Sequence, residues 1–398
     1  RFLLTISVLF SFVSCELPTV FETKHKNDND NSVTTIDPVT AIELSYPSGS
    51  TSLHQTPSII VSGVSSGDTV KLYTDSTCET EVATGTASSS TITLETSALS
   101  VASYTFYSDR VTSDNLAAEC STVTLSYTVE GCPTANGDYI LVPGNSDYHA
   151  DDFCVAKYEM KDVSSTATSQ TASLPWVSIS KTDAATECTN LGSGHDLISN
   201  AQWQTIARDI EGVNTNWEND VIGLDLLNTG HSDNDPTSLC DATVENVTTD
   251  CSTADTSFKQ TRTHTLSNAE VIWDFSGNAS EWVKDDNSVG TQYTASNTFV
   301  SALTDSSPST TGALDDGVNR AAKGHFGPSG AYDTTLNSIP YGGLGYLDGA
   351  QNASGSVNSI YRGSSRGSGY QASGIFAAGF TAASSQFNTL GFRCVFTE

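Results

Sequence analysis

The chain has 398 residues, which is enough for two or three domains with cores of their own. It carries 17 Lys and Arg residues against 46 Asp and Glu residues, so its net charge is −29. This charge repels nucleic acid and anionic lipid surfaces, and we therefore expect no nucleic-acid partner. Charged residues are only 16% of the chain, whereas Ser, Thr, Asn and Gly are abundant, which favours strands and long loops over long helices.

The chain begins with the basic Arg1 and an apolar run, Phe2–Val13, that ends next to Cys15. This segment resembles a bacterial lipoprotein signal. The resemblance implies that Cys15 is lipidated and that acyl chains are the protein's link to a membrane of the cell envelope. Phe12 stands where Leu is usual, so an ordinary secretory signal and a short membrane anchor stay open as alternatives, although the run is short for a bilayer. Glu16 after the cysteine, rather than Asp, favours the outer membrane or the cell surface.

Eight cysteines remain of the nine when Cys15 is set aside. An even number suits four disulfides in an oxidising compartment. No two cysteines form a CxxC pair and none stands with a His at zinc-site spacing, so a metal cluster is the weaker interpretation. Connectivity cannot be deduced from sequence alone, but the domain boundaries favour the pairs Cys78–Cys120, Cys132–Cys154, Cys240–Cys251 and Cys188–Cys394.

Composition shifts divide the rest of the chain into three parts. Residues 16–40 are polar with few large apolar side chains, which predicts a flexible tether. Residues 41–130 contain short alternating runs such as "SIIVSGV", "GDTVKLYTD" and "SYTFYSD" between turn residues, which predicts an all-β sandwich. This pattern resembles bacterial immunoglobulin-like modules, and the resemblance implies a spacer or an adhesion stalk.

The third part, residues 131–398, mixes strand and helix signals. The segment "FCVAKYEMK" from Phe153 predicts a strand. Ser180 can cap a helix with Asp183 completing the capping pattern. A second helix is predicted by "SNAQWQTIARDIEG", which begins at a Ser199 cap and ends at Gly212. Its predicted buried face is made of Trp203, Ile206, Ala207 and Ile210.

Three later phrases, "WDFSGNASEWVKD", "IYRGSSRG" and "LGFRCVF", occur in this order in the same part. They resemble the Gly-Asn-x-x-Glu-Trp, Arg-Gly-Gly-Ser and Gly-Phe-Arg segments of the formylglycine-generating enzyme, or sulfatase-modifying-factor, family. The resemblance implies an α+β fold of the C-type-lectin-like kind for residues 131–398. It also supports the Cys188–Cys394 pair, because such folds often tie their first helix to their last strand.

The family's oxidase activity is not expected here. That activity needs a pair of redox-active cysteines that bind copper shortly after the Arg-Gly-Gly-Ser segment, and no cysteine lies between Arg362 and Gly391. Another branch of the family holds non-haem iron with histidines, but the seven histidines are scattered and no two lie three or four residues apart. We therefore expect no catalytic residues of either type and neither copper nor iron.

A structural calcium ion is the metal that the resemblance does imply. In the family the Gly-Asn-x-x-Glu segment helps to hold Ca²⁺, and Asn278 and Glu281 offer hard oxygen ligands at those positions. The alternative is that Asn278 forms a turn and Glu281 a salt bridge, with the neighbouring tryptophans in the core.

The segment Arg362–Asn388 is built of Gly, Ser, Tyr, Ala, Phe and Gln, a composition similar to that of adaptable binding surfaces. In display proteins with C-type-lectin-like folds the ligand surface lies in this last part of the chain. The resemblance therefore implies Arg366, Tyr370, Gln371 and Phe387 as candidate ligand contacts. Alternatively, the small residues permit tight packing in the core, with Phe376, Phe380 and Phe392 buried.

Taken together, these patterns predict a lipoprotein anchored at the surface whose catalytically inactive C-terminal domain binds a glycan or protein ligand. A metal-dependent envelope enzyme of the sulfatase-modifying-factor family is the first alternative, and a structural envelope component is the second.

Overall fold

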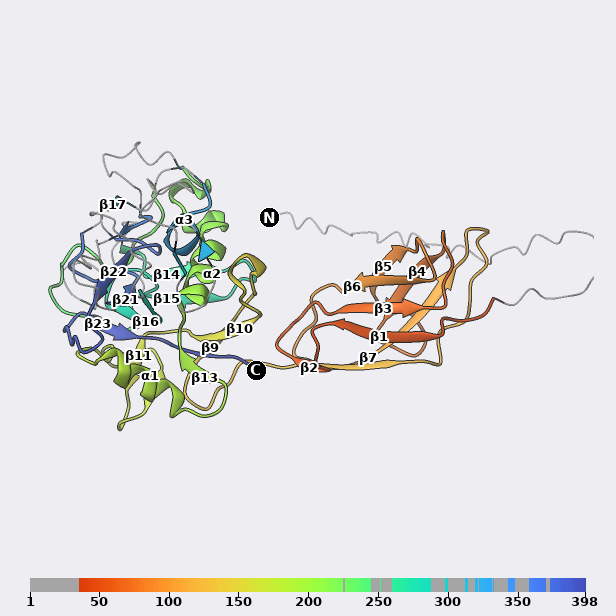
Figure 1. The fold of residues 1–398 in the computed structure, drawn as a ribbon, viewed down its shortest axis with the longest axis horizontal. Coiled ribbons are helices and arrows are strands. Elements are labelled where there is room, and N and C mark those ends of the chain that lie inside the picture. Colours follow the sequence, from red (N-terminus) through yellow and green to blue (C-terminus); the bar gives the residue numbers. More distant parts are fainter. Residues whose placement is uncertain are drawn as a thin grey trace, which may run out of the picture.

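The structure is a computed structural model, and it describes residues 36–224, 226–244, 251, 260–287, 298–299, 312–313, 319–320, 322–330, 332, 343–347, 358–369 and 373–398. Cys15, Tyr370, Gln371 and the predicted tether up to residue 35 lie outside the described residues. No helix in the described ranges is both long and apolar enough to cross a bilayer. Figure 1 shows a sandwich of strands joined to a larger part in which strands and helices mix.

The N-terminal sandwich consists of two sheets that share one core, and it begins before the predicted boundary at residue 41, because Val39, which the sequence placed in the tether, is buried in that core. Its strands are β1 (Ala41–Tyr46), β2 (Thr51–Ser52), β3 (Ser58–Ser62), β4 (Thr69–Tyr73), β5 (Glu81–Thr86), β6 (Thr91–Glu95), β7 (Ala102–Val111) and β8 (Leu125–Val129). They pair in the orders β1-β3-β6 and β2-β8-β7-β4-β5. Alternate residues of β3, Ile59 and Val61, are fully buried, as expected where one face of a strand meets the core. They pack in one cluster with Val70 and Leu72 of the other sheet.

The head, residues 131–398, begins with a four-stranded sheet in the order β13-β24-β10-β9. Its strands are β9 (Tyr139–Val142), β10 (Phe153–Ala156), β13 (His195–Leu197) and β24 (Cys394–Phe396). The last strand of the chain therefore lies between two strands that come from the beginning of the head (Figure 1).

A second, six-stranded sheet has the order β17-β20-β22-β21-β16-β23. Its strands are β16 (Ser280–Asn287), β17 (Thr298–Phe299), β20 (Tyr346–Leu347), β21 (Asn358–Arg362), β22 (Ala378–Thr381) and β23 (Leu390–Phe392). Strands β16 and β21 are antiparallel neighbours, so the two predicted family segments that they carry lie side by side.

Short hairpins and helices complete the head. The hairpins pair β11 (Met160–Asp162) with β12 (Ala167–Ser169), β14 (Thr263–Thr265) with β15 (Val271–Trp273), and β18 (Gly312–Ala313) with β19 (Asn319–Arg320). The helices are α1 (Lys181–Thr189), α2 (Asn200–Glu211) and α3 (Ala322–Phe326), and the 3-10 turns are η1 (Ser146–Tyr148), η2 (Asn214–Asn216) and η3 (Glu218–Asp220).

Both predicted helix starts are confirmed. The Ser180 side chain accepts a hydrogen bond from the Asp183 backbone at the start of α1. At the start of α2, Ser199 and Gln202 form the reciprocal capping box, and Gly212 is the C-cap. The predicted apolar face of α2 is fully buried, and Trp203 stacks on Phe275 with ring centroids 3.9 Å apart.

The four predicted disulfides are also confirmed: the structure joins Cys78–Cys120, Cys132–Cys154, Cys188–Cys394 and Cys240–Cys251. Cys188–Cys394 connects α1 with β24, and both cysteines lie in a buried apolar cluster with Trp282 and Phe392. This bridge fixes the first helix of the head to its last strand.

The sandwich and the head meet around Leu53, which is buried in one apolar cluster with Tyr139 and Cys154 of the head. Polar contacts surround it, since the Tyr46 hydroxyl donates to Asp151 over 3.2 Å. The junction therefore combines a buried apolar residue with hydrogen bonds between the two parts.

His54 makes the shortest polar contact of this junction. Its Nδ1 lies 2.7 Å from Asp152 Oδ2 of the head, and its Nε2 lies 3.1 Å from the Thr56 carbonyl oxygen. Asp152 only accepts hydrogen bonds, so Nδ1 carries a proton, while Nε2 lies near both the Thr56 carbonyl oxygen and, at 3.3 Å, the Thr56 hydroxyl. The hydrogen bond to Asp152 accordingly raises the pKa of His54, although burial opposes the shift.

We expect the contribution of His54 to stability to depend on pH. A raised pKa in the folded state means that this contribution is fully present below the usual histidine pKa of about 6.5 and is lost as the pH rises through the folded value. The measurement is the free energy of unfolding of the full chain and of His54→Gln between pH 5 and pH 9. The difference in free energy of unfolding between the two proteins should decrease as the pH rises. A difference that does not change with pH would contradict the ion pair between His54 and Asp152.

Candidate functional site

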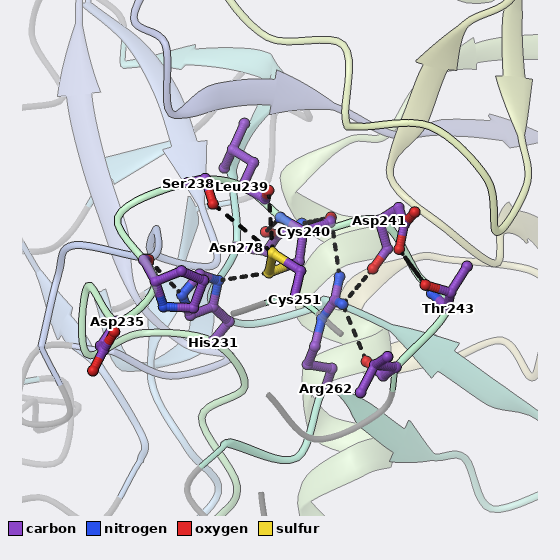
Figure 2. The surroundings of a disulfide bond; sticks show 12 residues. His231, Asp235, Ser238, Leu239, Cys240, Asp241, Thr243, Cys251, Arg262 and Asn278 are labelled. Atoms are coloured by element: carbon purple, nitrogen blue, oxygen red, sulfur yellow. Dashed lines mark hydrogen bonds between the residues drawn. A yellow bond between two sulfur atoms is a disulfide. The ribbon is translucent and has the colours of Figure 1, made fainter. Parts of the chain in front are cut away.

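The Gly-Asn-x-x-Glu segment begins with a buried turn at Asn278, which has a positive φ of 56°. The Asn278 side chain donates to Glu159 Oε2 over 2.6 Å and to the Cys240 carbonyl over 3.0 Å, and it accepts from the Cys240 N–H over 2.9 Å. Figure 2 shows this side chain next to Cys240. Both the oxygen and the nitrogen of the Asn278 side-chain amide are therefore hydrogen-bonded to protein groups.

Glu281 forms a two-pronged ion pair with Arg393 of the closing segment. Arg393 Nη2 lies 2.8 Å from Glu281 Oε1, Arg393 Nε lies 3.1 Å from Oε2, and both residues are fully buried. The guanidinium also donates to the carbonyls of Ala156 and Trp273. Burial raises the pKa of Glu281, and the Arg393 charge opposes this shift.

As placed, Asn278 and Glu281 do not fit a calcium site made from their two side chains. An ion would have to displace Arg393, which already balances the Glu281 charge. In the part of the chain that the structure describes, no three or more His, Cys, Asp or Glu residues are grouped so that they could hold a metal ion. The turn and the salt bridge are thus the arrangement found, and the calcium ion stays a prediction for metal analysis.

Sequence patterns did not indicate the other charges buried nearby. Lys161 Nζ lies 3.9 Å from Glu159 Oε2 with both side chains almost completely buried, and Arg262 forms an ion pair of 2.5 Å with Asp274. Burial raises the pKa of Glu159 and lowers that of Lys161. The "FCVAKYEMK" pattern predicted a strand, but nothing in it showed that two charged residues face the core.

A cavity of about 250 Å³ lies beside this charged core, on the β21 and β22 side of the six-stranded sheet. Its lining residues are Ser280, Tyr346, Tyr361, Arg362, Ser364, Ser368, Ala377 and Ala378. The Arg-Gly-Ser segment at the end of β21 thus supplies one wall. Ser280 lies on β16 and Tyr346 on β20, far from this segment in sequence, so no local pattern indicated that they line the same cavity.

Arg362 is a fully buried guanidinium surrounded by neutral acceptors. It donates to the carbonyls of Ala377 and His325 and to the side-chain oxygens of Asn200 and Gln204. Burial lowers its pKa to about 9, against the attraction of Asp285. Through these hydrogen bonds the guanidinium connects α2 and α3 with Ala377, which precedes β22. We infer that Arg362 positions the cavity wall rather than contacting a ligand.

Two of the four predicted ligand contacts lie in the described residues. Arg366 is half-buried, its guanidinium donates to the Asn234 side chain, and its N–H donates to the Asn278 carbonyl over 2.9 Å. Phe387 is 50% exposed, and its carbonyl accepts from the Ser178 N–H. Neither residue lines the cavity: Arg366 lies in sequence between the lining residues Ser364 and Ser368, and Phe387 lies outside that segment.

The packing alternative holds for Phe376 within the segment and for Phe392 just after it, which are both fully buried. Phe380 is half-buried against the core that contains Phe376. The segment Arg362–Asn388 therefore has side chains in the core, such as Phe376, and side chains at the surface, such as Phe387.

A larger cavity of about 590 Å³ lies at the junction with the sandwich, beside His54 and Lys284. Four of its charged or titratable groups form two pairs, because His54 pairs with Asp152 and Lys284 with Asp196. We favour the smaller cavity as the candidate site, because the predicted ligand segment forms its wall.

The eight cysteines that the structure describes are all in disulfides. In the described ranges, no free thiol therefore lies near the candidate site. The arrangement can bind, and its described groups do not include the thiol pair on which the family's oxidase chemistry depends.

Comparison with known proteins agrees with the sequence motifs. The model of the family described as the sulfatase-modifying factor enzyme 1-like domain matches residues 82–398. The match begins within the N-terminal sandwich, at β5. Among solved structures, Treponema denticola variable protein 1 is similar at 12% identity, with 66% of this chain and 92% of that chain covered and a TM-score of 0.32. No curated protein matches the chain.

Proposed function

Because the chain belongs to the sulfatase-modifying factor enzyme 1-like family, we propose that its head is a non-catalytic member that binds a glycan or protein ligand. The observation that carries this proposal is the cavity of about 250 Å³, one wall of which comes from the segment Arg362 to Ser368. The serine and tyrosine side chains that line it combine hydrogen-bonding groups with large rigid contact areas, as binding surfaces do.

The other parts of the chain have supporting roles in this proposal. The head is a C-type-lectin-like domain, and the sandwich is an immunoglobulin-like spacer that holds it away from the membrane. Lipidation at Cys15 anchors the protein to the cell envelope, at the outer membrane or the cell surface. The two-sheet core of the sandwich and the signal-like N-terminal segment support these roles.

Arrays of immobilised glycans and of surface proteins, probed with the chain from residue 16 onward, test the proposal. We expect saturable binding that Arg366→Ala and Ser368→Trp each weaken by about tenfold, which corresponds to roughly 1.4 kcal/mol. The first variant removes a charged contact, and the second fills the cavity. Ser113→Trp, the same substitution on an exposed loop of the sandwich, is the matched control and should bind normally.

The outcomes separate the proposal from its alternatives. Metal analysis of the purified protein accompanies the arrays, and calcium alone agrees with a non-catalytic head. Stoichiometric copper or iron together with turnover would favour a metal-dependent enzyme. The absence of any saturable ligand would favour a structural component of the envelope.

A further inference from the structure

The disulfide Cys240–Cys251 lies behind the Gly-Asn-x-x-Glu segment, and its two sulfurs differ in access to solvent. Cys240 is fully buried, whereas Cys251 is half-buried. Asn278 holds the backbone of Cys240 through both its N–H and its carbonyl. Figure 2 shows the disulfide with His231, Ser238 and Leu239 around it.

Each sulfur lies against a hydrogen-bond acceptor. Cys240 Sγ is 3.7 Å from His231 Nδ1, and Cys251 Sγ is 3.5 Å from the Leu239 carbonyl oxygen. These are distances at which a thiol would donate. A disulfide sulfur carries no hydrogen, so neither acceptor receives a proton from it in the oxidised protein.

His231 makes this arrangement informative, because its ring is fully buried. Its Nε2 lies 3.1 Å from the Pro236 carbonyl, which only accepts, so Nε2 carries the ring proton and Nδ1 presents a lone pair to the sulfur. Burial lowers the pKa of His231 and keeps the ring neutral. Within the described residues, Nδ1 has no partner except this sulfur, and a buried acceptor without a donor is unfavourable.

We propose that Cys240–Cys251 is a thiol–disulfide exchange site that accepts electrons from small thiols or dithiols, and that His231 and Leu239 stabilise its reduced form. Reduction places a hydrogen on each sulfur, and each new S–H group finds its acceptor already in position. The oxidised form lacks both hydrogen bonds.

The exchange is a two-electron reduction in two steps. A small thiolate attacks the more accessible Cys251 Sγ, and the S–S bond breaks with its electron pair on Cys240 Sγ. That sulfur takes a proton from water, and the resulting S–H group donates a hydrogen bond to His231 Nδ1. A second thiolate attacks the external sulfur of the mixed disulfide, which releases the small-molecule disulfide and the Cys251 thiolate. Ser238 Oγ, 3.9 Å from Cys251 Sγ, can donate to this thiolate before a proton from water replaces it.

Cys78–Cys120 in the sandwich is the matched control within the same chain. Both its cysteines are half-buried, so solvent access alone would make it at least as reducible. Neither of its sulfurs has a hydrogen-bond acceptor among the described contacts. A difference in reducibility between the two bridges would therefore follow from His231 and Leu239 rather than from exposure.

Graded dithiothreitol treatment of the folded full chain, followed by alkylation and mass spectrometry of each cysteine, tests the proposal. We expect Cys240 and Cys251 to be alkylated first, at a dithiothreitol concentration about tenfold below that needed for Cys78 and Cys120. His231→Phe should raise the concentration needed for Cys240–Cys251 about tenfold and leave Cys78–Cys120 unchanged. His231→Gln, whose side-chain oxygen can accept the S–H, should recover part of this shift.

The buried Cys188–Cys394 bridge reports folding, because it stays protected while the head is folded. The proposal is overturned if Cys240–Cys251 is reduced together with or after Cys78–Cys120 in the unsubstituted protein, a comparison that does not depend on any variant folding. It is also overturned if His231→Phe leaves the reduction of Cys240–Cys251 unchanged while Cys188–Cys394 remains protected.

Discussion

Replacing Arg393 by Met is expected to lower the free energy of unfolding by about 3–5 kcal/mol, because the Glu281 carboxylate then remains buried without its partner. In the intact protein, two hydrogen bonds of 2.8 and 3.1 Å join the two side chains, and neither side chain is exposed. The variant also leaves the carbonyls of Ala156 and Trp273 without their donor. The measurement is chemical unfolding of the full chain at pH 7.

Two comparisons decide whether the buried charge is the cause. Lys284→Met breaks the exposed pair with Asp196, whose side chains are 60% and 34% exposed, and such a pair is worth about 1 kcal/mol or less. The loss for Arg393→Met should also shrink at lower pH. Burial raises the pKa of Glu281, so the folded variant takes up a proton that the unfolded chain does not, and its stability falls as the pH rises. Equal losses for both variants, or a loss that does not change with pH, would contradict this account.

Removing the Cys188–Cys394 bridge with two Ala substitutions is expected to destabilise the chain by about 5 kcal/mol in the chain-entropy model. The bridge joins residues 206 apart in sequence, so its absence gives the unfolded chain the largest gain in conformational freedom of the four disulfides. Both cysteines are also fully buried in the core. The measurement is unfolding under non-reducing conditions.

The Cys132–Cys154 pair supplies the comparison within the head, because it spans only 22 residues. The same model gives about 3 kcal/mol for its removal. The order of the two losses is the test, and a larger loss for the shorter loop would mean that packing around the sulfurs outweighs loop entropy.

The sequence predicted those parts of the fold that depend on neighbouring residues. The capping residues Ser180 and Ser199 act within three positions along the chain, so their patterns were sufficient to locate both helix starts. The buried charges depend on contacts between residues far apart in sequence. Glu281 pairs with Arg393, which follows it by 112 residues, and Arg362 donates to Asn200, which precedes it by 162 residues. Local sequence patterns do not predict such contacts.

The Gly-Asn-x-x-Glu segment shows the same limit, because it could not indicate that Asn278 is hydrogen-bonded to Cys240 and that Glu281 is paired with Arg393. The calcium ion itself stays a prediction. The ligand segment was predicted from composition, and its residues Arg362, Ser364 and Ser368 line the cavity, whereas the predicted contact Arg366 does not. Ser280 and Tyr346 reach the same cavity from separate strands, which composition could not show.

Two of the three disulfides of the head, Cys132–Cys154 and Cys188–Cys394, also determine how it would respond to mechanical tension. A pull between the sandwich and a ligand held near Arg366 enters the head at Cys132, which a disulfide joins directly to Cys154. From there the covalent path runs along the chain to Cys188, crosses the second disulfide to Cys394 and returns to Arg366. The long arm between Cys188 and Arg366 carries no load. If the sheets of the head came apart, only the segments from Cys154 to Cys188 and from Arg366 to Cys394 would extend. The sandwich and the ligand would therefore stay connected with little increase in the distance between them.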